Sequence, residues 1–267
     1  MKITTWNINS VRLRLPNLAR IIKEISPDII CLQETKVRDE LFPAKSIKEL
    51  GYPYQAISGM KSYNGVAIIS KRPLLKIETK EWCKKSDCRH ILATVSEKNI
   101  GPITIHNFYV PAGGDVPDQT KNLKFAHKLM FLKEVAAWQK RERKKGQAEI
   151  LVGDLNIAPL PTDVWSHKKL LKTVSHTPVE VKALEKLQQA GDWTDAIREV
   201  VPPAEPLFTW WSYRAKDWKA SNRGRRLDHI WTTPVLNKYI SAVDVHQTTR
   251  GWNKPSDHIP VTLTLGI

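Results

Sequence analysis

Short apolar segments recur along the whole chain and end in polar side chains, which restricts the folds open to it. Eight segments are rich in Val, Ile, Thr or aromatic residues, as β-strands are. They are Lys2–Trp6, Asp28–Gln33, Gly65–Ser70, Ile91–Ser96, Ile103–Phe108, Glu149–Val152, Leu227–Trp231 and Pro260–Leu265. No internal repeat or low-complexity linker separates them. Strands distributed in this way indicate one set of packed sheets.

Three helical segments lie between these strands, each with apolar residues three or four positions apart on one face. The faces are Leu15, Leu18, Ile22 and Ile25; Phe125, Leu129, Leu132 and Ala136 within a long helix at Gln119–Lys145; and Val181, Leu184 and Leu187. Pro16 suits the first turn of its helix, and Thr177 and Glu180 form a capping box. We therefore expect a single α/β domain over residues 1–267, with the helices outside the sheets.

A strong positive charge accompanies this layout. The 267 residues include 42 Lys and Arg against 27 Asp and Glu, a net charge of +15 at pH 7. Such a surface attracts polyanions. Nucleic acid is the leading partner, because Lys and Arg that contact phosphates release condensed counterions. The alternative is that the charge serves solubility alone.

The cysteines and the amino-terminal residues bear on the compartment. Three cysteines, Cys31, Cys83 and Cys88, are an odd number, which argues against a disulfide framework and for a reducing compartment. The first residues lack the layout of a signal peptide, and no apolar run approaches the ~20 residues that would span a bilayer. We expect a cytoplasmic protein that does not bind membranes.

The polar residues at the strand ends are the candidates for chemistry. Asn7 follows the first strand and Glu34 the second, Asp154 follows a later one, Asp228 lies at the start of another, and Asp257 precedes the last. Each alone is most often a turn residue. Together they predict a wall of carboxylates and amides, whose hard oxygen atoms suit Mg²⁺ or Mn²⁺ better than zinc.

Six motifs containing these residues occur in order along the chain. They are Trp6–Arg12, Gln33–Lys36, Tyr109–Pro111, Gly153–Asn156, Arg226–Asp228 and Ser256–Pro260. From about the first residue to nearly the last, the chain resembles the exonuclease III family of abasic-site endonucleases. The resemblance implies a four-layer αββα sandwich of two packed mixed sheets flanked by helices, shared with pancreatic deoxyribonuclease and inositol-phosphate phosphatases.

The resemblance also implies roles for the residues that match the motifs. Glu34 would be the principal ligand of Mg²⁺, for which Mn²⁺ would substitute, with Asn7 beside it and Asp257 near the metal or at a second metal position. The implied catalytic residues are Asp154, which would activate the attacking water, Asn156, which would position it, His258 on the scissile phosphate, Asp228, which would orient His258, and Tyr109 near the phosphate or the leaving oxygen. Whether Asp154 or His258 takes the proton stays open. His229 is expected to point away from Asp228 and to be structural.

The segment from Trp210 to Arg226 interleaves aromatic and basic residues, which suits phosphate contact combined with stacking. The predicted DNA contacts are Arg214, Arg223, Arg225 and Arg226. The alternative is a core tryptophan pair beside a solvated basic loop. The resemblance implies a pocket for a flipped-out abasic sugar, with Trp210 and Leu227 in its wall. Ala112 and Arg225 depart from the family's pattern, which bears on the balance of activities.

Together with the positive charge, the resemblance implies a base-excision-repair nuclease that acts on double-stranded DNA with abasic or 3′-blocked lesions, as a monomer. It would hydrolyse the phosphodiester bond 5′ to an abasic site and leave a 3′-hydroxyl, with some 3′–5′ exonuclease and 3′-phosphodiesterase activity. One alternative is a phosphatase or sphingomyelinase on the same scaffold, although such relatives tend to have a histidine where Tyr109 stands. The other is a DNA-binding protein without catalysis, which the presence of Glu34, Asp154 and His258 disfavours.

Overall fold

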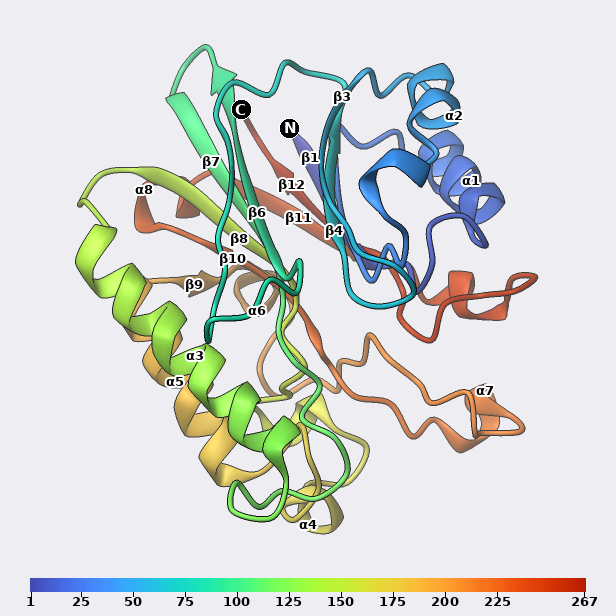
Figure 1. Ribbon diagram of the computed structural model, residues 1–267, viewed down its shortest axis with the longest axis vertical. Coiled ribbons are helices and arrows are strands. Elements are labelled where there is room, and N and C mark those ends of the chain that lie inside the picture. Colours follow the sequence, from blue (N-terminus) through green and yellow to red (C-terminus); the bar gives the residue numbers. More distant parts are fainter.

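Two six-stranded sheets pack face to face in the computed structural model, which describes residues 1–267 (Figure 1). The first sheet has the order β11-β12-β1-β2-β4-β3, and the second has the order β5-β6-β7-β8-β10-β9. The strands of the first sheet are β1 Lys2–Asn7, β2 Ile29–Gln33, β3 Tyr54–Ser58, β4 Val66–Ser70, β11 Ile240–Val245 and β12 Val261–Leu265. Those of the second are β5 Ile77–Thr79, β6 His90–Glu97, β7 Gly101–Tyr109, β8 Ala148–Asp154, β9 Thr194–Asp195 and β10 Asp228–Thr232.

The register of the central strands brings the polar strand ends together. In the first sheet β1 and β2 are parallel, so that Asn7 pairs with Gln33 and lies next to Glu34. In the second sheet β7 and β8 are parallel and β10 is antiparallel to β8, which places Asp154 opposite both Tyr109 and Asp228. Both sheets therefore deliver their predicted site residues to one edge of the sandwich.

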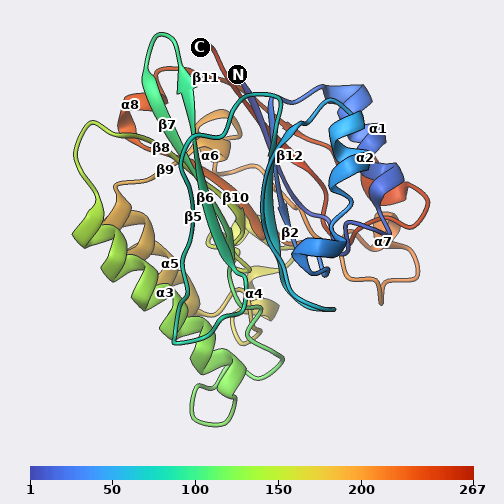
Figure 2. The same ribbon diagram turned by 45° about the horizontal axis from the view of Figure 1, so that its top comes forward.

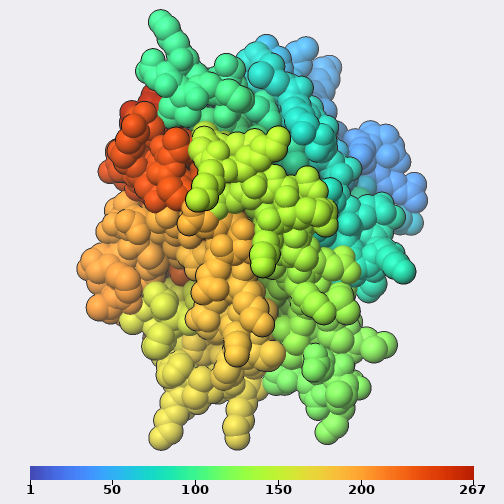
Figure 3. Space-filling view, turned by 90° about the vertical axis from the view of Figure 1, so that its left-hand side faces the viewer, coloured from blue at the N-terminus to red at the C-terminus, as the bar shows by residue number.

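Three apolar cores separate four layers. The largest core lies between the two sheets and includes Ile3, Ile68 and Val152. A second core packs the first sheet against helices α1 (Leu15–Ile25) and α2 (Ala44–Glu49), and a third packs the second sheet against α3 (Leu123–Glu142) and α5 (Pro178–Gly191). Figures 1 and 2 show these helix pairs on opposite flanks of the sheets, and Figure 3 shows α3 and α5 side by side. The predicted four-layer αββα sandwich is confirmed.

The remaining helices are short and lie in the connections. They are α4 His167–Leu170, α6 Ala196–Val200, α7 Trp218–Ser221 and α8 Pro234–Asn237, with 3₁₀ turns at Asp39–Leu41, Pro161–Asp163 and Gln247–Gly251. None of the helices has the length and apolarity needed to cross a membrane.

The long helix differs in detail from its prediction. Helix α3 begins at Leu123 rather than Gln119, because the side chain of Asn122 accepts a hydrogen bond from the backbone of Lys124 and caps the helix. Its buried face contains Lys128, a residue that an apolar pattern does not select, whereas the predicted Leu129 is only half buried. A lysine side chain therefore joins the amino-terminal parts of α3 and α5, where it contacts Glu180.

Candidate active site

One amide joins predicted site residues of the two sheets. Asn7 is fully buried at the end of β1, and its Nδ2 donates to Glu34 Oε1 at 3.0 Å and to Asp154 Oδ2 at 2.8 Å. Its Oδ1 accepts from the backbone N–H of Asn9 at 3.1 Å. The predicted ligand Asn7 therefore also fixes the spacing between two carboxylates that come from different sheets.

Glu34 lies in a left-handed backbone conformation, with φ +52°, directly after β2. This conformation is uncommon for a residue with a side chain and often marks a functional site. Tyr109 donates its hydroxyl to Oε1 at 2.8 Å, and the Lys36 ammonium lies 2.7 Å from Oε2. Burial alone would raise the pKa of Glu34, but Lys36 and the hydrogen bonds outweigh it and lower the pKa, so the carboxylate stays charged.

Asp154 and Asn156 form a compact turn at the end of β8. Asp154 Oδ1 accepts from the Asn156 backbone N–H at 2.9 Å, and its Oδ2 accepts from Asn156 Nδ2 at 3.1 Å. Asn156 Nδ2 also donates to the Val110 carbonyl at 2.9 Å, and this residue adopts φ +54°. Burial, opposed by His258 and reinforced by Asp228 and Glu34, raises the pKa of Asp154 to about 7.

Asp228 and His258 form a buried pair. His258 Nδ1 lies 2.9 Å from Asp228 Oδ2, which also accepts from the Thr209 hydroxyl at 2.6 Å, and His258 Nε2 lies 3.6 Å from Asp154 Oδ2. Burial opposes a charged imidazole, but attraction to Asp228 and then Asp154 outweighs it and raises the pKa of His258 to about 10. His258 is therefore an imidazolium at neutral pH and a donor at both ring nitrogens.

Asp257 directly precedes His258 in the chain and binds two donors outside the Asp228–His258 pair. Its Oδ1 accepts from Asn9 Nδ2 and its Oδ2 from the Trp210 indole N–H, both at 2.9 Å. Burial opposes ionisation, but His258 and these two donors outweigh it and lower the pKa of Asp257. The carboxylate therefore stays ionised. It links the edge of the sandwich that carries the predicted catalytic residues, the catalytic edge, to the aromatic and basic segment from Trp210 to Arg226.

The donor atoms at this edge suit a hard divalent cation. Single atoms of Asp154, Asp228 and His258 lie within 4.8 Å of one another, the spacing of a metal site. His258 Nδ1 is already committed to Asp228. Glu34 supplies two carboxylate oxygens and Asn7 one amide oxygen at the same strand ends, and Mg²⁺ prefers such oxygen atoms over nitrogen or sulfur. The chemistry of the site thus fits the predicted class of metal.

A cavity of about 560 Å³ opens beside these groups and contains most of the other predicted site residues. Its lining includes Trp210, Leu227, Arg214, Arg223, Arg225 and Ala112 together with Glu34, Tyr109, Asp154, Asn156, Asp257 and His258. Trp165 also lines it, with the Arg223 guanidinium 5.0 Å from its ring centre. Trp165 was not predicted, because nothing in the sequence distinguishes it from a core tryptophan.

Two adjacent arginines have different environments. The Arg225 guanidinium stacks 5.2 Å from the ring centre of Trp210 and donates to the Val174 carbonyl at 3.0 Å and to Ser175 Oγ at 2.8 Å. The Arg226 side chain is fully buried and binds Asp163 and Asp195. The prediction of Arg226 as a DNA contact is wrong, because neighbours in an extended segment point to opposite sides.

A basic pocket beside the catalytic edge was not predicted. It has a volume of about 330 Å³, and its charged lining residues are Arg12, Lys36, Arg38 and Lys61. Lys36 connects it to Glu34. Lys36 and Arg38 share the loop after β2, whereas Arg12 and Lys61 come from two other loops, so spacing along the sequence does not reveal that the four residues meet.

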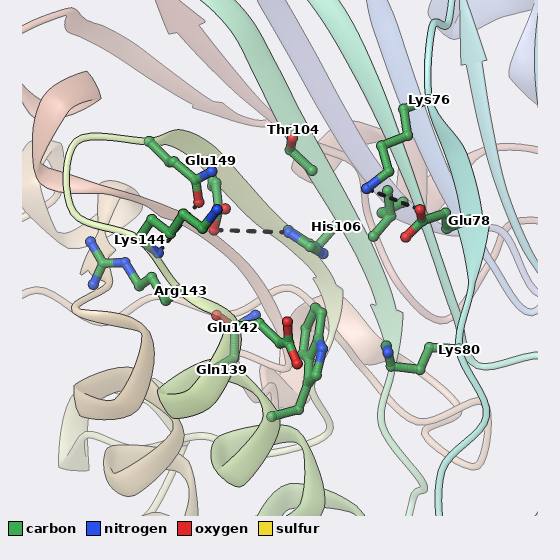
Figure 4. A pocket seen from close by; sticks show the side chains of 13 residues that line it. Lys76, Glu78, Lys80, Thr104, His106, Gln139, Glu142, Arg143, Lys144 and Glu149 are labelled. Atoms are coloured by element: carbon green, nitrogen blue, oxygen red, sulfur yellow. Dashed lines mark hydrogen bonds and ion pairs between the residues drawn. The ribbon is translucent and has the colours of Figure 1, made fainter.

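Another cleft, of about 350 Å³, lies on the outer face of the second sheet (Figure 4). Lys76, Lys80, Glu78 and Glu149 are among its charged residues, and His106 Nε2 lies 3.9 Å from Glu149 Oε2. Its lining mixes both signs of charge and includes none of the predicted site residues. The catalytic edge is therefore the candidate active site.

Known proteins resemble the chain over its full length. A model of the endonuclease/exonuclease/phosphatase family matches residues 4–258. Exodeoxyribonuclease III of Haemophilus influenzae is 32% identical over 98% of both chains, and the DNA repair nuclease APEX1 of Danio rerio is 28% identical over 100% of this chain and 83% of its own.

Solved structures agree. An AP endonuclease from Archaeoglobus fulgidus superimposes over 100% of both chains with a TM-score of 0.91 and 32% identity. NExo, a 3′ phosphatase from Neisseria bound to a product DNA hairpin, superimposes over 99% of both chains with a TM-score of 0.90 and 32% identity. From the matched model, the full-length relatives and the shared fold, the chain belongs to the endonuclease/exonuclease/phosphatase family, in the branch of exonuclease III and the AP endonucleases.

Proposed function

We propose that the protein is a DNA-repair nuclease that hydrolyses the phosphodiester bond 5′ to an abasic site and leaves a 3′-hydroxyl. It would also show some 3′–5′ exonuclease and 3′-phosphodiesterase activity on double-stranded DNA. The observation that carries the proposal is the buried contact of Asp154 with His258, 3.6 Å apart, at the floor of a cavity rimmed by arginines. A proton acceptor and an imidazolium side by side suit attack on an anionic phosphodiester.

The proposed metal is Mg²⁺, with Mn²⁺ as a substitute, held by Glu34 with Asn7 and Asp257 near it. When bound, such an ion neutralises charge on the phosphate and polarises its P–O bonds. Glu34 suits this role because its pKa is lowered and it remains ionised.

The protonation states divide the work between Asp154 and His258. Because His258 keeps its proton at neutral pH, it donates from Nε2 to a phosphate oxygen and stabilises the negative charge that develops there. Asp154, with a pKa of about 7, is the group able to accept a proton from the attacking water. Asn156 holds the Asp154 carboxylate in place. Tyr109 is a neutral phenol, because burial and Glu34 raise its pKa, and its single O–H would turn from Glu34 to the leaving oxygen of the bound substrate.

The apolar wall and the basic residues of the cavity would select the lesion. Trp210 and Leu227 give it an apolar wall that a sugar without a base would fit. Arg214 and Arg223, with the basic pocket of Arg12, Lys36, Arg38 and Lys61, lie where they would bind backbone phosphates. Arg225 stacks on Trp210 and adds a cation to the wall formed by Trp210 and Leu227, which we call the lesion wall. A cation there favours a terminal 3′-phosphate as a further substrate, and a 3′ phosphatase is among the similar solved structures.

The first test compares two substrates with Mg²⁺ and with EDTA: a duplex with one abasic analogue, and a primer-template with a 3′-phosphate. We expect one metal-dependent cut 5′ to the analogue. The variant Asp154→Asn should lose at least about 100-fold in rate, whereas Asp244→Asn, an exposed carboxylate on β11, should not change it. An uncut abasic duplex with a processed 3′-phosphate would overturn the abasic-site proposal in favour of a 3′-end enzyme.

A further inference from the structure

A buried lysine lies behind the lining of the active-site cavity without being part of that lining. Lys128, on α3, has a fully buried side chain. Its Nζ donates to the Asn156 carbonyl at 2.8 Å, to the Ala112 carbonyl at 3.2 Å and to Glu180 Oε1 at 2.5 Å. A lysine ammonium has three donors. All three are therefore used, which is the arrangement that makes a buried charge tolerable.

Two of these acceptors belong to the walls of the active-site cavity. Asn156 holds both oxygens of Asp154, and Ala112 follows the segment that begins at Tyr109. The loop that continues from Ala112 packs against the lysine side chain, because a Cβ built on Gly113 would lie 3.0 Å from Lys128 Cδ. Lys128 thus holds the backbone of two cavity loops from below.

Glu180 connects the same ammonium to the lesion wall. Its carboxylate, fully buried in the first turn of α5, accepts two hydrogen bonds from the Ser175 backbone N–H, at 2.9 Å each, besides those of the Thr177 capping box. Ser175 Oγ in turn accepts from Arg225. Hydrogen bonds therefore run from Asn156 through Lys128 and Glu180 to Ser175 and Arg225.

We propose that Lys128, paired with Glu180, is a positioning residue for phosphodiester hydrolysis: it holds the Asn156 backbone so that Asp154 is aligned with the scissile phosphate. Asn156 adopts the left-handed conformation, which asparagine tolerates better than most residues, and the hydrogen bond from Lys128 to its carbonyl fixes this turn in place. Lys128 lies under the cavity rather than in its lining, so it acts on the alignment of the reacting groups and not on DNA binding.

The inference rests on the proposed function only in that Asp154 takes part in phosphodiester hydrolysis, whichever DNA end or lesion is cut. The test variant is the double substitution Lys128→Met with Glu180→Gln. It removes both charges together, because a lone buried charge would destabilise the fold, whereas loss of a whole pair is often nearly neutral. The change Glu180→Gln keeps the length of the side chain and hence the reach of the capping box. Lys133→Met, which replaces an exposed lysine on the same helix, is the matched control.

We expect the double variant to lose about 10- to 100-fold in kcat, since a displacement of about 1 Å at a reacting group has effects of that size. KM for the duplex and the midpoint of urea unfolding should stay close to those of the wild type. Hydrogen exchange of the segment 153–158 should become faster in the double variant and not in Lys133→Met. This last readout needs no turnover, so it tests the tether even if the choice of substrate is wrong.

An unchanged kcat in the double variant, or unchanged exchange at 153–158, would overturn the positioning role. A loss of activity that only follows the unfolded fraction would also overturn it. Failure of the wild type to cut the abasic duplex, with faster exchange in the double variant, would instead count against the proposed substrate and support the tether.

Discussion

His258 owes its charge to one neighbour more than to any other. Attraction to Asp228, 2.9 Å from Nδ1, is the largest influence that opposes burial and raises the pKa of the imidazole. Thr209 fixes the same carboxylate oxygen, so the pair has a single orientation. Removing the charge of Asp228 while keeping its shape would separate the electrostatic from the steric contribution.

The variant Asp228→Asn should lower the pKa of His258 and reduce the rate of cleavage at pH 7.5 by about 100-fold, since an uncharged imidazole stabilises a phosphate anion poorly. NMR titration of His258 and single-turnover cleavage measure the two effects. Asp244→Asn serves as the control. A rate equal to that of the wild type would mean that the imidazolium is not needed.

At the scale of elements, the capping box of α5 offers a local test. Thr177 Oγ1 accepts from the Glu180 backbone N–H, and the Glu180 carboxylate accepts from Thr177. Thr177→Ala should lower the free energy of unfolding by about 1 kcal/mol. Urea denaturation measures this, with Val179→Ala, an exposed position in the same turn, as the control. Equal losses in both variants would show that the cap contributes nothing of its own.

Elements with strong local signals were predictable, and those with weak signals were not. Helix α5 begins at Pro178 as its capping box and proline predict, and the buried central strands lie within a few residues of their predicted ranges. The strands that were not predicted, β3, β5, β9 and β11, are short or partly exposed, so they show little apolar patterning. Their positions depend on pairing with central strands that are distant in the sequence.

The same division holds for the candidate site. Residues such as Glu34 and Asp154 end buried strands and belong to recognisable motifs, so the sequence alone indicated them, and the structure brings them together. Arg226 and Lys128 show the limit. Each is a cation whose partners, Asp163 and Glu180, lie more than 50 residues away, and only the folded structure shows that these charges are internal.

For the whole molecule, buried histidines predict a dependence of stability on pH. Burial lowers the pKa of His106 to about 3 and that of His229 to about 4, and it lowers the pKa of His90 well below its ordinary value. Above about pH 6.5 these groups are neutral in both the folded and the unfolded chain. Below it the unfolded chain takes up protons on these histidines that the folded chain does not, so their contribution to stability falls as the pH falls.

Each such histidine should lower the free energy of unfolding by about 1.4 kcal/mol per pH unit below about pH 6.5. Urea unfolding at pH 7.5, 6.0 and 5.0 measures the slope. The variant His229→Gln should reduce it, because one proton fewer is then taken up on unfolding. An identical slope in the variant and the wild type would contradict this account.

The hydrogen bonds of Asn7 to Glu34 and Asp154 join the two sheets, and this has a consequence for the stage of folding at which activity arises. The first sheet and its flanking loops carry Asn7, Glu34 and His258, and the second carries Tyr109, Asp154 and Asp228. Neither sheet carries a complete set of reacting groups. A displacement of one sheet relative to the other by one residue, about 3.3 Å, would leave every strand intact. It would separate the reacting groups and abolish hydrolysis. The rate of turnover therefore reports the alignment of the two sheets. On partial unfolding, activity should be lost before the β-strands unfold.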